Sequence, residues 1–167
     1  NTEDVEGALA RLLDPRNHVE AVIMVGTAKP CAKFMRLARA QGLSPVFATV
    51  STVGSQLLAR ELTNEAEGVV VTQVVPHWLD HTPITDLYRQ TGLTPSHLSL
   101  EGFIIARAFV ELMTASSDDT SREALIDTAE SGRSIDLGLG FQITMSPARH
   151  QLSDRVWLTR IRHGKVE

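Results

Sequence analysis

Short apolar runs alternate with segments of helical periodicity in the first 75 residues of the chain. Three runs rich in β-branched residues predict strands, and they lie at 21–25, 46–50 and 68–75. Between them, residues 28–41 and 55–62 place apolar side chains every three or four positions, which predicts helices. This order is typical of right-handed βαβ units, so the predicted fold class is α/β with a parallel sheet.

The ends of these elements carry further signals. An amphipathic pattern predicts one more helix over 2–13, ahead of the first strand. The run at 21–25 is wholly apolar, so we expect this strand to be buried on both faces, as in other parallel sheets. Gly42 is placed to end the helix before it in a left-handed cap, and Pro76 ends the third strand.

Helical patterns dominate the chain after Pro76. A short helix is predicted over 84–90, and a longer one, capped by Ser96, over 97–114. Because the longer helix is apolar almost all round, we expect it to be buried. A third helix is predicted over 122–130, opened by a capping box of Thr120 with Glu123 and closed by Gly132. Alternating residues predict strands at 141–144 and 155–162.

The apolar helices between residues 83 and 132 have no neighbouring strands of matching length to cover. Helices of this kind normally pack on a parallel sheet, so the pattern implies a sheet from residues outside this chain or from a second copy of it. We expect self-association through helix 97–114 if its apolar surface stays uncovered. The alternative is a single compact three-layer domain in which all the helices share one short sheet.

Composition narrows the classes of function. The chain has 167 residues, 43% of them hydrophobic, and a formal charge of −4, with basic residues scattered along its length. A nucleic-acid partner is therefore not expected. No apolar stretch approaches the roughly 20 residues that span a bilayer. The single Cys31 excludes an internal disulfide and any metal site with several cysteines.

Candidate chemistry is scarce. His77, Asp80 and His81 have metal-like spacing, but flanking prolines favour a loop and no third ligand is evident, so no metal is expected. The Gly138-Leu139-Gly140 run lacks the rest of a dinucleotide fingerprint, so no cofactor is expected. No serine lies in a nucleophile-elbow context, and no catalytic residue can be named. We therefore do not expect an enzyme.

The predicted parallel sheet indicates a candidate site for ligand binding. In open parallel sheets, ligands bind beyond the carboxyl ends of the strands. Those positions here hold Thr27 and Ala28 after the first strand and Ser51 and Thr52 after the second. Their hydroxyls and the backbone N–H groups of the following helices can receive a polar or anionic group. The alternative is that Thr27 and Ser51 only cap their helices.

The first part of the chain contains the runs AVIMVG at 21–26, KFMRLARAQG at 33–42, TVSTVG at 49–54 and AEGVVVTQVVP at 66–76. These runs resemble those of the leucine/isoleucine/valine receptors, which are type I periplasmic solute-binding proteins. They resemble the second half of the receptors' second lobe and the strand that leaves it through the hinge. Later runs resemble two helices of the first lobe and the tail that returns through the hinge. They are SLEGF at 99–103, REALI at 122–126, HQLS at 150–153 and VWLT at 156–159.

The resemblance implies that this chain is the C-terminal portion of such a receptor. Residues 1–75 would form the second half of ligand-binding lobe 2, residues 76–150 the hinge crossing and the C-terminal helices of lobe 1, and residues 151–167 the return to the terminal strand of lobe 2. Pro76, Ser99 and Glu101 would then lie at the hinge or at the rim of the pocket.

The family implies a binder that closes two lobes on a small molecule and delivers it to an ABC importer outside the cytoplasm, in the periplasm. The ligand would be an amino acid or an aliphatic or aromatic acid. Alternatives are a periplasmic sensory domain joined to a fused signalling module and, less favoured, a Rossmann-like enzyme domain. The enzyme would need an acid, a base or an activated nucleophile at the strand ends, where this sequence offers only hydroxyls.

The resemblance also bears on the ligand. Thr27 stands where an aromatic side chain often lines the family's pocket, and Ser51 stands where branched-chain receptors use a carboxylate to hold the ligand's ammonium group. Without that acid a buried ammonium loses a charge-assisted hydrogen bond worth about 1.5–3 kcal/mol. We therefore expect that a plain branched-chain amino acid is not the favoured ligand.

Overall fold

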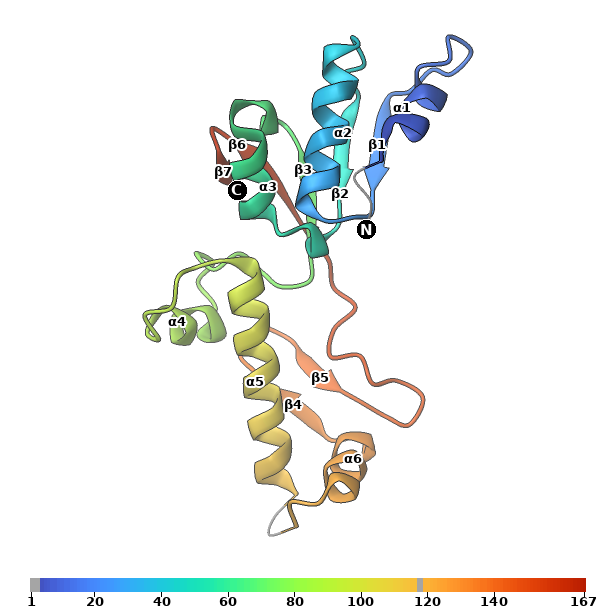
Figure 1. Ribbon diagram of the computed structural model, residues 1–167. Coiled ribbons are helices and arrows are strands. Elements are labelled where there is room, and N and C mark those ends of the chain that lie inside the picture. Colours follow the sequence, from blue (N-terminus) through green and yellow to red (C-terminus); the bar gives the residue numbers. More distant parts are fainter. Residues whose placement is uncertain (1–3, 117–118) are drawn as a thin grey trace. The chain divides into compact units, whose positions relative to one another are not determined.

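The computed structural model describes residues 4–116 and 119–167, which form two compact units (Figure 1). Unit 1 comprises Asn1–Gln73 and Val156–Glu167, and unit 2 comprises Val74–Arg155. Two units are present, so the alternative of a single three-layer domain is wrong. No helix within the described ranges is long and apolar enough to cross a membrane.

Unit 1 is a five-stranded sheet with helices, in the strand order β1-β2-β3-β6-β7. Its elements are α1 (Glu6–Leu12), β1 (Ala21–Met24), α2 (Ala28–Ala40), β2 (Val46–Thr49), α3 (Ser55–Leu62), β3 (Val70–Gln73), β6 (Trp157–Arg162) and β7 (Lys165–Val166). β1, β2 and β3 pair in parallel, which confirms the predicted βαβ order, and β6 joins β3 antiparallel. The predicted helix 2–13 is observed from Glu6, and its first two positions lie outside the described residues.

One face of this sheet, here called the inner face, is covered by helices. Phe47, Val71 and Ile161 point to it and are at most 2% exposed. The ring of Phe34 on α2 meets the ring of Phe47 edge-on at 6.4 Å between centroids. Figure 1 shows α2 and α3 side by side over this face, as successive right-handed crossovers in one direction require.

The opposite, outer face corrects a prediction. β1 was expected to be buried on both faces, but Ile23 is 76% exposed and Val25 is 82% exposed. The apolar sequence of the strand is that of an interior strand, yet no described segment covers its outer face. β1 is also the last strand at its edge of the sheet.

Unit 2 packs three helices with a two-stranded antiparallel sheet. The elements are α4 (Pro83–Arg89), α5 (His97–Ala115), α6 (Arg122–Glu130), β4 (Ser134–Asp136) and β5 (Gln142–Thr144). One hydrophobic cluster joins Leu100 and Ile104 of α5 to Ile135 of β4 and Ile143 of β5. Ser134–Asp136 was not predicted as a strand, but β4 and β5 have only three residues each, so neither strand matches the 19-residue α5 in length.

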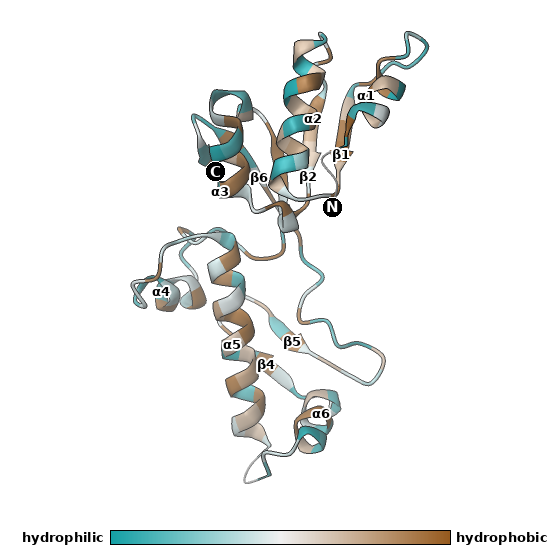
Figure 2. Cartoon of the chain, in the orientation of Figure 1, coloured by the Kyte–Doolittle hydropathy of each residue, from teal (hydrophilic) through white to brown (hydrophobic). Residues whose placement is uncertain are grey.

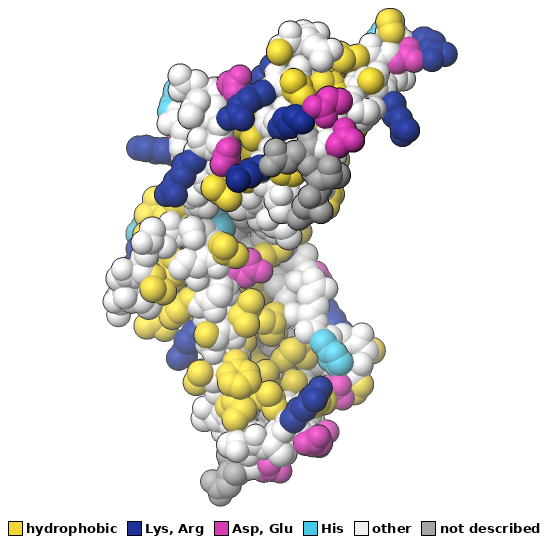
Figure 3. Space-filling model, in the orientation of Figure 1, with side chains coloured by type: hydrophobic (Ala, Val, Ile, Leu, Met, Phe, Trp, Pro, Cys, Tyr) yellow, Lys and Arg dark blue, Asp and Glu magenta, His cyan; other side chains and the backbone are white. Residues whose placement is uncertain are grey.

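Helix α5 corrects a second prediction, because it is buried on one side only. Leu100, Ile104 and Ala108 face the core, whereas Ile105 and Phe109 are 53% and 51% exposed. The short β4–β5 pair covers one face of the helix, and no described element covers the other. Figure 2 shows the hydrophobic character of α5, and Figure 3 shows hydrophobic side chains gathered on the visible face of unit 2.

The helix ends largely follow their local signals. Ser96 caps α5, and its Oγ accepts a hydrogen bond of 3.0 Å from the N–H of Ser99. Gly42 has a φ of 82° just after α2, which confirms the left-handed cap. The capping box of Thr120 with Glu123 is wrong, because the cap of α6 is Ser121, whose Oγ accepts from the N–H of Ala124.

Candidate functional site

The carboxyl ends of β1 and β2 meet at one edge of the unit 1 sheet. Met24 pairs with Thr49 in the parallel register, so Thr27 and Ser51 follow within three residues at the same edge. Ala28 and Thr52 lie next to them in the chain. The structure therefore brings together the four positions that the sequence indicated for ligand binding.

Helix α2 begins at this edge. Thr27 occupies its N-cap position in an extended conformation, but the hydroxyl makes no capping hydrogen bond. The first intrahelical bond runs from the N–H of Cys31 to the carbonyl of Thr27. Helix geometry leaves the N–H groups of Ala28 and Lys29 without an acceptor in α2. Thr27 is exposed and Ala28 is buried, so an exposed hydroxyl lies beside the positive end of a 13-residue helix.

The second loop is shaped differently. Ser51 opens a 3-10 turn, η1 (Ser51–Val53), and Gly54 follows with a φ of 71° as the N-cap of α3. Ser51 therefore is not the N-cap of α3, whereas Thr27 is the N-cap residue of α2 without a capping hydrogen bond from its hydroxyl. The first bond of α3 runs from the N–H of Leu58 to the carbonyl of Gly54. The N–H groups of Ser55 and Gln56 thus lack an acceptor within α3.

Charge at this edge has one sign. Across residues 26–30 and 50–56 the only charged side chain is that of Lys29, in the first turn of α2. A cation at the positive end of a helix is electrostatically unfavourable unless an anion approaches. Sequence reasoning missed Lys29, although a lysine in the first turn without an acidic neighbour was a signal that could have identified it.

Pro76, Ser99 and Glu101, the predicted hinge or rim residues, all lie in unit 2. Pro76 is buried, whereas Ser99 and Glu101 are half-buried in the first turns of α5. Two positions along an α-helix are about 200° apart, so these two side chains point in nearly opposite directions. Only one of them can face a given surface.

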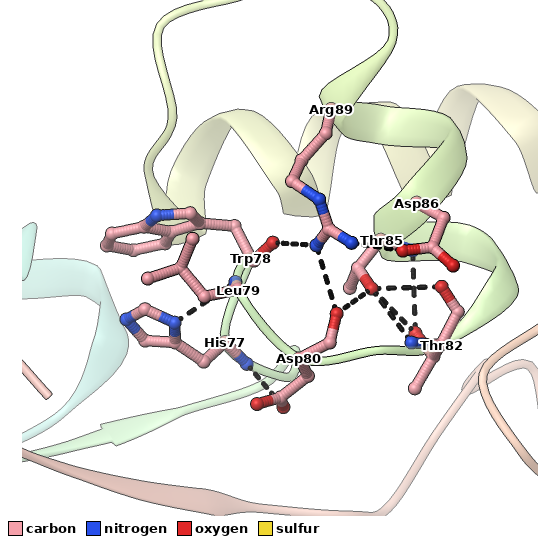
Figure 4. A network of polar contacts seen from close by, with 8 residues as sticks. All are labelled: His77, Trp78, Leu79, Asp80, Thr82, Thr85, Asp86 and Arg89. Atoms are coloured by element: carbon pink, nitrogen blue, oxygen red, sulfur yellow. Dashed lines mark hydrogen bonds and ion pairs between the residues drawn. The ribbon is translucent and has the colours of Figure 1, made fainter.

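The loop after Pro76 is fixed by its own polar groups (Figure 4). The guanidinium of Arg89 donates to the carbonyls of Trp78 and Asp80, at 2.6 and 3.0 Å. His77 Nδ1 accepts from the N–H of Leu79, and the Asp80 carboxylate accepts from the N–H of His77. The prediction of a loop is confirmed, and the His77 imidazole and the Asp80 carboxylate both accept hydrogen bonds from the backbone of this loop. Among the residues that the structure describes, no cluster of three potential metal ligands occurs.

A buried histidine is the feature that sequence reasoning missed in unit 2. His97 at the start of α5 is 4% exposed, and neither ring nitrogen has a hydrogen-bond partner. Its ring lies edge-on to Trp78 at 4.9 Å and to His77 at 5.4 Å. Burial, with a smaller contribution from His77, lowers the pKa of His97 from 6.5 to about 4. The imidazole is therefore neutral at pH 7.

Comparison with known proteins identifies the family. A family model described as periplasmic binding protein matches residues 1–165. The chain belongs to the periplasmic binding protein family. Its mixed sheet with parallel β1, β2 and β3 is that of a type I periplasmic-binding lobe, as predicted. Comparison with curated proteins found no match.

Several solved structures resemble the chain along nearly its whole length. A possible leucine/isoleucine/valine-binding protein from Rhodopirellula baltica has 38% identity and a TM-score of 0.93, with 99% of this chain and 47% of that protein covered. A leucine binding protein from Thermotoga maritima has 16% identity and a TM-score of 0.82, covering 100% and 48%. The chain thus spans about half the length of the structures that it matches.

A third match carries a different ligand in its name. A fatty acid ABC transporter substrate-binding protein from Thermomonospora curvata has 19% identity and a TM-score of 0.73, with 98% of this chain and 44% of that protein covered. At this identity, as for the Thermotoga protein, the likeness shows the fold alone. The fold is common to these proteins, and the ligands in their names differ.

Proposed function

We propose that the chain is part of a periplasmic receptor that binds a small polar or anionic solute and delivers it to the membrane subunits of an ABC importer. Unit 1 would belong to lobe 2 of the receptor and unit 2 to lobe 1. The two chain crossings, Gln73 to Val74 and Arg155 to Val156, would then form part of the hinge. The family match over residues 1–165 supports a solute-binding protein rather than an enzyme.

The chemical class of the ligand is inferred from the groups at the carboxyl edge of the unit 1 sheet. Two helix N-termini, the hydroxyls of Thr27, Ser51 and Thr52, and the ammonium of Lys29 supply donors, and no carboxylate lies among residues 26–30 and 50–56. Helix N-termini favour anions because their free N–H groups and the helix dipole both act on negative charge. We therefore propose that a carboxylate of the solute binds here.

The same edge disfavours a plain branched-chain amino acid. Such a ligand brings an ammonium group that needs an acceptor with negative charge, and Ser51 offers only a hydroxyl. Lys29 adds a repulsive charge on the same edge. An aliphatic or aromatic acid fits this charge distribution better than leucine does.

Titration of the isotope-labelled chain, followed by the NMR signals of its backbone amides, tests the proposal. We expect hexanoate and benzoate at millimolar concentration to shift the amide signals of Ala28, Lys29 and Ser55, and leucine to shift them less. Lys29→Gln should weaken the binding of either acid about tenfold or more, since a hydrogen bond to a charged group is worth about 1.5–3 kcal/mol. Lys165→Gln, at an exposed position on strand β7, is the matched control and should leave binding unchanged.

Two results would overturn the ligand assignment. One is leucine binding more tightly than either acid, and the other is shifts from the acids that leave the amides of residues 27–29 unaffected. Binding of a solute elsewhere in the chain would support the proposed receptor function but would show that this edge is not the binding site.

A further inference from the structure

The hairpin of β6 and β7 carries a group of basic side chains on the outer face of the unit 1 sheet. Residues 155–166 contain four Lys or Arg residues and no Asp or Glu, in a chain whose formal charge is −4. Exposed and buried positions alternate along β6, and Arg160 and Arg162 are both exposed. Arg162 pairs directly with Lys165 of β7, which is also exposed. These three cations, here called the basic row, therefore lie on one face.

The basic row has no acidic partner within the described ranges of the chain. The backbones of Arg160 and Glu167 exchange hydrogen bonds of 2.7 and 2.9 Å, which places Glu167 beside Arg160 in the ladder. No ion pair joins this carboxylate, or any other described one, to the basic row. The Glu67 carboxylate instead accepts a hydrogen bond of 2.8 Å from the N–H of His163, in the turn between the two strands. The hairpin is thus held in place by backbone contacts that leave its cations unpaired.

Two like charges face each other in this hairpin. Directly paired residues of an antiparallel ladder have Cβ atoms about 4.5–5.5 Å apart, and like charges at such positions are destabilising. Arg162 and Lys165 form such a pair. A lysine on an edge strand hinders pairing with other chains, which accounts for Lys165 on β7. It does not account for Arg160 and Arg162, because β6 lies between β3 and β7 in the sheet.

The spacing of the basic row indicates the shape of a partner. Arg160 and Arg162 are two positions apart on one strand, so their Cα atoms lie about 6.6–6.8 Å apart. Alternate side chains of any extended segment repeat at this distance. A segment that lies along β6 with acidic residues at alternate positions would therefore place a carboxylate beside each arginine, and Lys165 would lie beside the second. An anionic membrane surface fits less well, since its recognition typically takes clusters of about four to eight cations.

We propose that the basic row is a docking surface for an extended acidic segment of a partner protein, with carboxylates at alternate positions. Such a segment neutralises the repulsion between Arg162 and Lys165, and guanidinium groups bind carboxylates through two parallel hydrogen bonds. Lys and Arg are almost never fully buried without a partner, so the basic row stays accessible until the segment binds. The proposal does not depend on the solute or on the site where it binds.

Stability gives the first test. Arg162→Gln with Lys165→Gln should raise the melting temperature of unit 1 by about 1–5 °C at about 10 mM salt, because it removes the cross-strand repulsion. The increase should disappear at about 1 M salt, where the Debye length is about 3 Å. Trp157 fluorescence, with Trp78 replaced by Phe, follows unit 1. Arg60→Gln, at an exposed position on α3, is the matched control and should give no increase. A lower melting temperature for the double variant at low salt overturns the proposal.

Binding gives the second test, with a capped heptapeptide that has glutamate at alternate positions as the probe. Backbone amide signals of the isotope-labelled chain report the contact, and we expect shifts at residues 160–165. Arg162→Gln with Lys165→Gln should weaken binding about fivefold or more, since two charge contacts are lost. Arg60→Gln should leave binding unchanged, and the same peptide with glutamine in place of glutamate should cause no shifts.

Three results would contradict the docking surface. They are no binding of the glutamate peptide, equal binding of the glutamine peptide, and shifts that leave residues 160–165 unaffected. Vesicles of phosphatidylglycerol provide the remaining comparison. If these vesicles sediment the parent chain but not the double variant, and the glutamate peptide does not bind, the partner is a membrane surface and the proposal is overturned.

Discussion

Gln73 Nε2 donates a hydrogen bond of 3.1 Å to Thr159 Oγ1, which joins the last residue of β3 to the middle of β6 on the inner face of the unit 1 sheet. The Thr159 hydroxyl in turn donates to the carbonyl of Val71 at 3.0 Å. Gln73 is 1% exposed and Thr159 is 6% exposed. Buried polar groups of this kind are costly to leave without partners.

The first prediction concerns this pair. Thr159→Val should reduce the free energy of unfolding of unit 1 by about 1–3 kcal/mol, because it leaves the buried Gln73 amide without its acceptor. Gln73→Leu combined with Thr159→Val should cost less than the sum of the two single changes, since both partners are then apolar. Urea unfolding followed by Trp157 fluorescence, with Trp78 replaced by Phe, measures unit 1 alone.

Thr72→Val is the control for Thr159→Val, because it makes the same chemical change at a neighbour of Gln73 in β3. Thr72 is half-buried and lies on the outer face of the sheet. Its effect should stay within about 0.5 kcal/mol. Strict additivity of the Gln73 and Thr159 changes would show that the hydrogen bond contributes nothing specific.

A second prediction concerns pH. The unfolded state binds a proton on His97 near pH 6.5, whereas the folded state resists protonation until about pH 4. The contribution of His97 to stability is therefore fully present above pH 6.5 and is lost as the pH falls from 6.5 towards 4. The loss should reach at most about 3 kcal/mol.

His97→Phe should remove this part of the acid dependence, because it retains an aromatic ring without a titrating group. Unfolding of unit 2, followed by Trp78 fluorescence with Trp157 replaced by Phe, gives the free energy at each pH. His18→Gln, at an exposed position in unit 1, should leave the profile unchanged. Parallel pH profiles for the parent and His97→Phe would contradict the assignment.

A third prediction concerns the exposed side of α5. Leu98, Ile105, Phe109 and Val110 are between 51% and 73% exposed and lie within one apolar stripe. In isolation the chain should self-associate through this stripe. Light scattering at about 100 µM should show a mass above that of one chain, and Ile105→Lys with Phe109→Lys should reduce it.

Asp127→Lys, at an exposed position on α6, controls for the change in net charge and should leave the mass unchanged. A parent chain that scatters as a monomer and binds no hydrophobic dye would rule out the stripe as an association surface.

Local signals predicted much of the fold, because they depend on neighbours in the chain. The serine at position 96 and the glycine at position 42 marked helix ends by backbone chemistry alone, and both predictions are confirmed. At the start of α6, Thr120 and Ser121 are adjacent hydroxyl residues, and sequence spacing chose the wrong one. β4 was missed because Ser134–Asp136 is too short for alternation to stand out.

Exposure was the harder property to predict, because it depends on segments that pack from elsewhere. Ile23 and Phe109 have the sequence context of interior residues, and nothing in their neighbourhood in the chain indicates that one side is open. The candidate site was located because strand ends in parallel sheets follow a general rule. Lys29 and His97 were missed because their significance comes from a helix dipole and from burial.

Unit 2 lies within the sequence of unit 1, between β3 and β6. During synthesis the ribosome therefore makes all of Val74–Arg155 before the strand that pairs with β3 exists. At about 5–20 residues per second, this delay lasts roughly 4–16 s. For that time the edge of β3 and the amide of Gln73 have no partner from β6. The nascent chain thus completes its second unit first, and a chaperone that shields strand edges would act on the N-terminal unit during this interval.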